Sequence, residues 1–563
     1  MLDRLPPAGT VTVTFDKNDS DSDEVVTEQQ VRWANLGDRV ILMPEEPNRV
    51  GWRFMGWNTA ANGSGTPFLP STTVNNNKTV YAQWEEIIVA IDQFLLTINQ
   101  TNGGTVTPSY RVVRVGEAVE IVAIPNTGWG FLRWERVEGG TVAFGNINNA
   151  STTVTLTSEQ TTIIRAVFEM TYEATLDYSI FDPPIPITIP HNINSIRIVG
   201  RGNHEFNTNI VVANRVNPLR IEFQNFVTQA AIGMHGISST SNIPIDLYFS
   251  GVNKIVGGVG INVTAAGQNA GRGSNGISSV GAVNIYTIGH YKTTIEGGNG
   301  GTAGNNNNNG NRAGNAGDGG HGITAFNVNM YGVFYVIGGN GGTGGIFGNP
   351  GGLGGAGGHG IVANNIDLCG DFNVIGGNGG LGGRGGDRGT GVSNNGRDGG
   401  AGGNGGTAIH ASSQVIFSQS MLFADIVGGT GGTGGRGGNT DSSTSYGGWG
   451  GRGGRGGHGI EGNEVTLNLA VMTLSVRGGA GGIGGGAGRG FRAAGQEGRR
   501  GATGGDGGNA VYYTTTIVNY FSLELFKGGA GGTGGDGGPM NGGARTGPQG
   551  HSGAAGGAVE NKA

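Results

Sequence analysis

The sequence predicts an all-β protein in which two small modules precede a parallel β-solenoid that carries stacked glycine-rich excursions. Three observations support this: short strands of alternating apolar residues at the front, dense apolar blocks from residue 173, and glycine triplets between the later blocks. The chain has 563 residues, of which 121 are glycine, and 13% are charged. Such a composition is typical of disorder, but 36% of the residues are hydrophobic and gather in compact blocks. We therefore expect a folded chain of several domains.

The first module is predicted over residues 8–86. Val11, Val13 and Phe15 alternate as in a half-buried strand, and Trp57 and Trp84 are large apolar groups that we expect in its core. The stretch resembles the internalin-type B repeat, also called the Listeria–Bacteroides repeat. The motifs that carry this resemblance are VTFD (13–16), GDRVILMP (37–44), FMGW (54–57) and TVYAQW (79–84).

The second module is predicted over residues 92–170 and resembles a divergent B repeat. Its motifs are GGTVTP (103–108), VGEAVEIVAIPNTGWGFLRW (115–134) and TTIIRAVFE (161–169). The two resemblances imply β-grasp-like spacer or adhesion modules of secreted bacterial proteins, without catalytic residues.

Residues 173–296 are predicted to form the N-terminal rungs of a parallel β-helix, and residues 297–563 a glycine-rich β-solenoid. The segment 322–339 aligns with 360–377, so that inward apolar positions of one rung recur in the next. The aligned pairs are Ile323 with Ile361, Ala325 with Ala363, Val328 with Ile366, Met330 with Leu368, Phe334 with Phe372, and Val336 with Val374. The segment 459–479 keeps this pattern. The longer blocks 408–427 and 509–527 are interpreted as rungs that carry a bulge.

Glycine excursions follow the rungs, and nearly every one goes out in Gly-Gly-x triplets, turns, and returns in the same triplets. They begin at residues 297, 338, 376, 428, 478 and 528. A period of three matches polyproline II geometry, and such helices pack side by side only where the contact positions lack Cβ. We therefore predict stacked polyglycine II limbs in which both glycines face neighbours. Collagen is excluded because it needs one glycine per triplet and abundant proline, and the chain has 17 prolines. The triplets resemble mycobacterial PGRS domains, distal phage adhesins and springtail antifreeze proteins.

Charge and cysteine usage exclude several classes of protein. The formal net charge is −6 with no block of like charge, so we expect no nucleic-acid partner. The Arg-Gly-Gly units at Arg384, Arg436, Arg452 and Arg455 are interpreted as solvated. The single cysteine, Cys369, excludes an intrachain disulfide framework. No apolar run approaches the length of a membrane span, so we expect no membrane insertion. MLDRLPPAGT lacks an apolar leader, so we expect a removed leader or a longer parent protein.

Two patterns suggest metal binding, and both have a simpler interpretation. His321, His359 and His458 recur in GGHGI, but Thr407 and Asn509 take the same place in other excursions. A polar ladder is therefore expected there instead of a metal site. Asp19, Asp21 and Asp23 alternate as in a calcium loop, but the turn glycine is missing, which favours a solvated hairpin. We predict no metal and no cofactor.

Parallel β-helices also carry polysaccharide-active enzymes, which need clustered carboxylates. Asp367, Asp371 and Asp425 are acids of the later rungs, and they form no column. We therefore predict no catalytic residues and no enzymatic activity.

The tips of the excursions differ in length and chemistry, which is typical of binding loops on a rigid scaffold. The predicted binding residues are Phe347, Arg388, Tyr446, Trp449, Phe491 and Arg492. The sequence thus predicts an extracellular adhesin or structural protein of the bacterial surface, binding a glycan or protein on another cell and able to self-associate end to end. The alternatives are ice binding, favoured by Thr302, Thr343, Thr430 and Thr533 at outward positions, or a β-helix enzyme acting on polysaccharides.

Overall fold

The computed structural model contains strands and no helix among the residues that it describes. These are residues 10–19, 29–35, 38–39, 44, 46–49, 52–69, 71–86, 93–101, 104–126, 129–288, 291–306, 311–388, 395–417, 423–441, 445–467, 473–491, 499–519, 526–541 and 546–561. Residues 5–173 and residues 174–563 form two compact units, and each is described by itself.

The first repeat of the smaller unit is a five-stranded sheet in the order β2-β1-β7-β4-β5, beside a pair of short strands. The sheet strands are β2 (Gln29–Asn35), β1 (Thr10–Asp16), β7 (Lys78–Glu86), β4 (Trp52–Asn58) and β5 (Pro67–Phe68), and the pair is β3 (Asp38–Arg39) with β6 (Thr73–Val74). Val11, Val13, Phe15 and Trp57 are buried as predicted. Trp84 is half-buried instead, and its indole N–H donates to the carbonyl of Lys17 at 2.8 Å.

The second repeat consists of two four-stranded sheets around the buried Trp134. One sheet has the order β10 (Tyr110–Val113), β8 (Phe94–Gln100), β15 (Thr162–Met170), β12 (Trp129–Gly139). The other has the order β13 (Val142–Phe144), β14 (Ser151–Leu156), β11 (Ala118–Pro125), β9 (Gly104–Thr107). These small sheets confirm the predicted all-β front of the chain.

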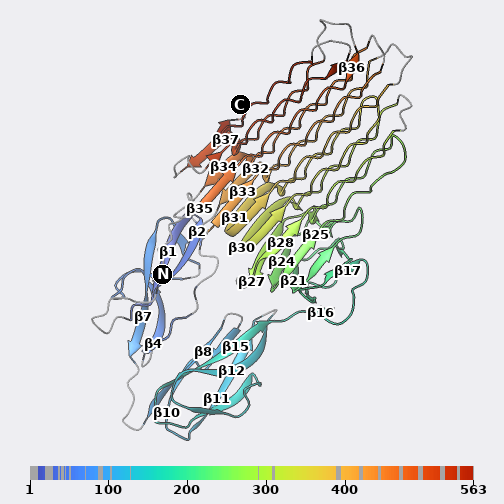
Figure 1. Cartoon of the computed structure of the whole chain (residues 1–563). Helices are drawn as coiled ribbons and strands as arrows, with labels where there is room; N and C mark the ends of the chain where they lie inside the picture. The colour runs from blue at the N-terminus through green and yellow to red at the C-terminus, as the bar shows by residue number, and fades with distance from the viewer. Residues whose placement is uncertain are drawn as a thin grey trace. The chain divides into compact units, whose positions relative to one another are not determined.

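The larger unit is a parallel β-solenoid whose strands stack in three ladders (Figure 1). The first ladder contains β17 (Ile187–Ile189), β20 (Ile210–Val212), β23 (Ile237–Ser239), β26 (Ile277–Ser279), β29 (Ile323–Thr324) and β40 (Val559–Asn561). The second contains β16 (Ala174–Asp177), β18 (Ser195–Val199), β21 (Leu219–Gln224), β24 (Ile245–Ser250) and β27 (Val283–Ile288). The third contains β19 (Glu205–Phe206), β22 (Val227–Gln229), β25 (Asn253–Val256), β28 (Thr293–Glu296), β33 (Phe423–Val427), β35 (Thr473–Arg477) and β38 (Phe526–Lys527). Longer strands join two or three ladders: β30 (Asn327–Ile337), β31 (Ile361–Ile375), β32 (Ile409–Phe417), β34 (Ile460–Leu467) and β37 (Val511–Asn519).

One apolar core runs through the solenoid from Tyr178 to Phe526. Strands β30 and β31 pair in the predicted register, with Val328 opposite Ile366 and Phe334 opposite Phe372, because the same inward side chains recur at the same spacing. The predicted bulge of the block 408–427 is also confirmed. The register of β31 against β32 shifts between Ala363 and Asn365, which pair with Ala411 and Gln414.

The glycine excursions leave the solenoid between the third ladder and the first, and their limbs run side by side in Figure 1. We call the segment that leaves a rung an out limb and the segment that comes back a return limb. The excursions span residues 257–276, 297–322, 338–360, 376–408, 428–459, 478–510 and 528–558. The first lies one turn earlier than the sequence predicted: its limbs bond to those of the next excursion, as in Gly260 N–H to Asn299 at 2.7 Å, although its out limb has few glycine triplets.

Each limb is bonded to its neighbours in a pattern that repeats every triplet. In the out limb 338–346, the first-glycine N–H of Gly341 donates to the Asn378 carbonyl of the next out limb at 2.8 Å. The second-glycine N–H of Gly342 donates to Gly317 in the preceding return limb at 2.9 Å. First glycines thus donate to a limb of the same kind, out limb to out limb or return limb to return limb, whereas second glycines donate to a limb of the other kind. The out limbs therefore form one layer and the return limbs another.

Both glycines of a triplet are required by the closeness of neighbouring backbone. A Cβ on Gly341 would lie 1.9 Å from the carbonyl oxygen of Gly355, and one on Gly342 would lie 2.0 Å from that of Gly301. Real Cβ atoms essentially never approach within 3.0 Å. The third position of each triplet is therefore left to carry a full side chain, out of the lattice.

Candidate binding surface at the outer ends of the glycine limbs

The third-position side chains form columns along the two layers, and many of them complete the hydrogen bonding of the backbone. The N–H of Asn340 donates to the side-chain oxygen of Asn299 at 2.8 Å, and that of Asn378 donates to Asn340 at 2.8 Å. Thr430 continues this column and donates its N–H to Asn378 at 2.9 Å. The third N–H of a triplet points away from other limbs, so an Asn or Asp of the preceding turn serves as its acceptor.

The histidines form the predicted polar ladder where the return limbs meet the rungs. The Nδ1 atom of His321 accepts the N–H of His359 at 2.9 Å, and Nδ1 of His359 accepts that of Thr407 at 2.8 Å. His458 accepts the N–H of Asn509 in the same way at 2.9 Å. Burial lowers the pKa of His359 to about 4, and the neighbouring His321 and His410 add to this effect. An accepting Nδ1 is unprotonated, so the neutral imidazole is the form that fits the ladder. No group of His, Cys, Asp or Glu in the described parts of the chain is placed to hold a metal ion.

The threonines proposed for ice binding do not share one column. Thr302, Thr343 and Thr533 lie in a column whose other members are Leu381, Thr433 and Ile483. Thr430 belongs instead to the column of Asn299, which lies one triplet nearer to the rungs. The prediction from the sequence that Thr430 aligns with Thr302, Thr343 and Thr533 was therefore wrong by one triplet. Leu381 and Ile483 are 51% and 50% exposed, which interrupts the hydroxyl column with bulky apolar groups.

Phe347 lies at a tip and is held by two arginines. Its φ of 65° is unusual for a residue other than glycine, and its N–H donates to the carbonyl of Arg384 at 2.9 Å. The Arg384 guanidinium lies 5.9 Å from the Phe347 ring centroid and pairs with Asp387. The guanidinium of the buried Arg397 donates to the Phe347 carbonyl at 3.4 Å.

Arg388 continues the lattice through its backbone. Its N–H donates to Asn439 at 2.8 Å, and its carbonyl accepts the N–H of Asp441 at 3.2 Å. This predicted binding residue therefore fixes the outer end of one limb against the next.

Tyr446 and Trp449 lie on one return limb and share a partner that the sequence did not indicate. The guanidinium of Arg499 lies 4.9 Å from the Trp449 ring and 5.6 Å from the Tyr446 ring. Asp398 accepts the N–H of Trp449 at 2.8 Å and lies 3.7 Å from Arg499. The Arg499 side chain is 16% exposed, and burial lowers the pKa of its guanidinium. We call Asp398, Tyr446, Trp449 and Arg499 the outer cluster.

The outer cluster combines groups that bind sugars or proteins. Trp449 is 44% exposed and offers an indole surface, while Asp398 offers a carboxylate. Phe347 and Arg388 belong to different contacts. The backbone of Phe491 lies in β36 (Gly490–Phe491), which pairs with β39 (Met540–Asn541), but its side chain and Arg492 lie outside the described residues. Arg499 belongs to the same tip as Phe491. The signal in the sequence that could have identified Arg499 is a cationic side chain near this predicted aromatic residue.

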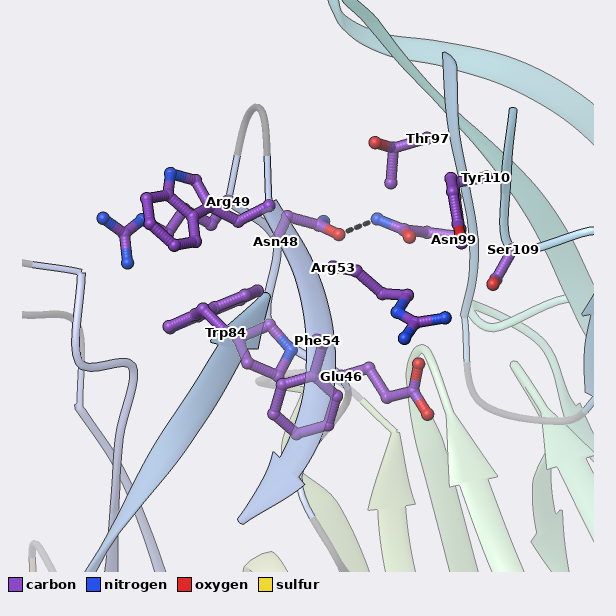
Figure 2. A pocket seen from close by; sticks show the side chains of 12 residues that line it. Glu46, Asn48, Arg49, Arg53, Phe54, Trp84, Thr97, Asn99, Ser109 and Tyr110 are labelled. Carbon is purple, nitrogen blue, oxygen red and sulfur yellow. Dashed lines mark hydrogen bonds between the residues drawn. The ribbon is translucent and has the colours of Figure 1, made fainter. Parts of the chain in front are cut away.

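A hollow lies in the smaller unit, between β4 and β7 of the first repeat and β8 and β10 of the second (Figure 2). Arg49 stacks over Trp52 at 4.0 Å, Arg53 lies 5.8 Å from the Tyr110 ring, and Asn99 donates to Asn48. Its volume of about 50 Å³ corresponds to a few water molecules. This hollow is therefore a weaker candidate than the outer cluster.

The aspartate segment that was weighed against a calcium loop is only partly within the described residues. Asp19 pairs with Lys17 at 2.9 Å, whereas Asp21 and Asp23 lie outside the described residues.

Comparison with known proteins confirms both resemblances at the front of the chain. Residues 12–83 match the Listeria-Bacteroides repeat domain, and residues 94–171 match the Divergent InlB B-repeat domain. An Evansella cellulosilytica protein with the inferred name Gly-rich membrane protein is 34% identical over 82 residues, or 13% of this chain and 9% of that protein. A second protein of that organism, with the inferred name membrane protein, is 30% identical over 112 residues, or 19% of this chain and 16% of that protein. The chain thus spans a small part of either relative, and no solved structure matches it. Nothing helical in the described segments is long and apolar enough to cross a membrane.

Proposed function

We propose that the chain is a non-catalytic bacterial surface protein, placed outside the cell, that adheres to glycans through the outer cluster. In this proposal the limbs are polyglycine II helices, and their two-layer lattice is a rigid support for the tips. The matches to B-repeat domains and to proteins named as membrane proteins support the placement at the surface.

The observation that carries the proposal is the way the lattice holds an exposed aromatic side chain. The Trp449 N–H is bonded to Asp398, its carbonyl accepts from Gly399 at 2.8 Å, and its ring rests on Arg499. Little conformational entropy is then left to lose when a ligand binds. Aromatic and arginine side chains on such a support are typical anchors of binding surfaces.

Two of the three aspartates that the sequence offered for catalysis have structural partners. Asp371 accepts the N–H of Phe423 at 3.0 Å, and Asp425 pairs with Arg477 at 2.8 Å. These contacts support a role without catalysis. Incubation with uronate-containing polysaccharides and mucin glycans should leave them unchanged, and any cleavage would contradict this part of the proposal.

Glycan-array binding of the full chain tests the adhesive role. Trp449→Ala should lose most of the binding, whereas Leu381→Ala, which removes an exposed apolar side chain from the other layer, should retain it. Equal binding by both variants, or no glycan bound by the parent chain, would contradict the proposal.

A further inference from the structure

The last return limb departs from the glycine pattern on one side only. In interior return limbs, the first glycine of a triplet packs against the out limb of the following excursion. A Cβ on Gly453 would lie 2.0 Å from the Gly482 carbonyl oxygen, and one on Gly504 would lie 1.9 Å from that of Gly532. Any side chain larger than hydrogen at these positions therefore meets the next limb.

In the last return limb, residues 546–557, these first positions are Gln549, Ser552 and Ala555. The bonds from Gly501 to Pro548 at 3.0 Å, Gly504 to His551 at 2.9 Å and Gly507 to Ala554 at 2.8 Å fix this alignment. All three side chains are exposed.

The second positions of the same limb are still glycine. A Cβ on Gly550, Gly553 or Gly556 would lie 2.0 Å from a carbonyl oxygen of the preceding return limb. Glycine is thus lost only on the side on which no limb of the described residues packs.

The first out limb shows the mirror image of this departure. Second glycines of out limbs pack on the preceding out limb, and a Cβ on Gly301 would lie 2.1 Å from the Ile261 carbonyl oxygen. In the first out limb these positions hold Ile261, which is 57% exposed, and the exposed Thr264. The earlier second position, Gly258, does pack on backbone, since a Cβ there would lie 1.9 Å from the Ala231 carbonyl oxygen, and this position is still glycine.

We propose that Gln549, Ser552 and Ala555 at one end, and Ile261 and Thr264 at the other, are caps that prevent a second copy of this chain from extending the lattice. A glycine limb is the partner that would otherwise fit. No acceptor for the N–H groups of Ser552 and Ala555 lies within the described residues, whereas the equivalent Gly504 and Gly507 donate to the next turn. Open edges of this kind promote association unless side chains block them, and terminal repeats of solenoids commonly act as caps. This proposal is opposed to the end-to-end association expected from the sequence.

Sedimentation velocity of the full chain over a range of concentrations tests the caps. The triple variant Gln549→Gly, Ser552→Gly, Ala555→Gly should associate at least tenfold more tightly than the parent chain, which should stay monomeric. The control His551→Gly, Ala554→Gly gains glycine at outward third positions and should behave as the parent does.

The variant Ile261→Gly, Thr264→Gly tests the other end independently and keeps the proposal testable if added glycine unfolds the last limb. Gly260 and Val263 still tie the first out limb to the next one at 2.7 and 2.9 Å. Association of the parent chain, equal association of the control, or failure of both cap variants to associate would overturn the proposal.

Discussion

Replacing one second glycine by valine should break the lattice locally. Gly432 belongs to the out limb 428–439 and donates its N–H to Gly403 at 2.7 Å. A Cβ there would lie 1.9 Å from the carbonyl oxygen of Gly380 and 2.7 Å from its carbonyl carbon. The clash is relieved only if the out limbs that contain Gly432 and Gly380 separate by about an ångström, because both nearby atoms belong to the backbone of Gly380.

The expected cost follows from the contacts that such a separation removes. The bonds of Gly379 to Thr430 and of Gly382 to Thr433, at 2.8 and 2.9 Å, join these two limbs and would both be lost or stretched, at about 1 kcal/mol each. Overpacking adds roughly 1–3 kcal/mol. Gly432→Val should therefore destabilise this part of the lattice by about 3–5 kcal/mol.

Limited proteolysis of the excursion 428–459, together with urea unfolding, measures this effect, because a local opening need not unfold the whole solenoid. Thr433→Val is the matched control, since Thr433 is the adjacent third-position residue and the substitution keeps its shape. It should change stability by less than about 0.5 kcal/mol. If the two variants resist urea and protease equally, the close-packing argument is refuted.

Three other predictions concern single side chains. The pKa of His359 is lowered to about 4 from about 6.5 in the unfolded chain; the neutral ladder is therefore fully stable above pH ~6.5 and loses about 3 kcal/mol as the pH falls toward 4. An NMR titration and acid unfolding should show this, and His359→Asn, which keeps an acceptor for Thr407, should reduce the loss. Asn378→Leu removes the acceptor of the Thr430 N–H, which should raise amide exchange at Thr430 and cost about 1 kcal/mol of stability; unchanged exchange would contradict the role of the side-chain ladder. Arg499→Ala should weaken glycan binding as Trp449→Ala does, since it removes the support of the indole ring, and unimpaired binding would separate Arg499 from the site.

The rungs could be predicted from the sequence because their inward side chains recur at fixed spacing. Val328 and Ile366, or Phe334 and Phe372, are similar in size and face the same core, so alignment gives the register directly. Glycine triplets resemble one another too closely for that. Thr430 was therefore placed in the wrong column, although counting triplets from the rung would have put it opposite Asn378.

The candidate site was predictable only in part. Tyr446 and Trp449 are conspicuous among glycines, so composition alone identified them. Their contact with Arg499 and Asp398 depends on which residues of separate excursions become neighbours, and this follows from the limb register. The first limbs, at 257–276, were missed because they contain few glycine triplets. Ile261 faces no earlier limb on one side, so that position does not need glycine.

Residue-resolved amide hydrogen exchange of the limbs tests the lattice most directly. In the out limb 428–439, Gly431 and Gly432 donate to Ala480 and Gly403 at 2.8 and 2.7 Å, and Thr430 donates to the side chain of Asn378. These three amides should exchange slowly, whereas Thr433, whose counterpart in the preceding turn is Leu381, should exchange fast. Uniformly fast exchange along the limb, or equal rates for Gly432 and Thr433, would contradict a lattice held by backbone hydrogen bonds.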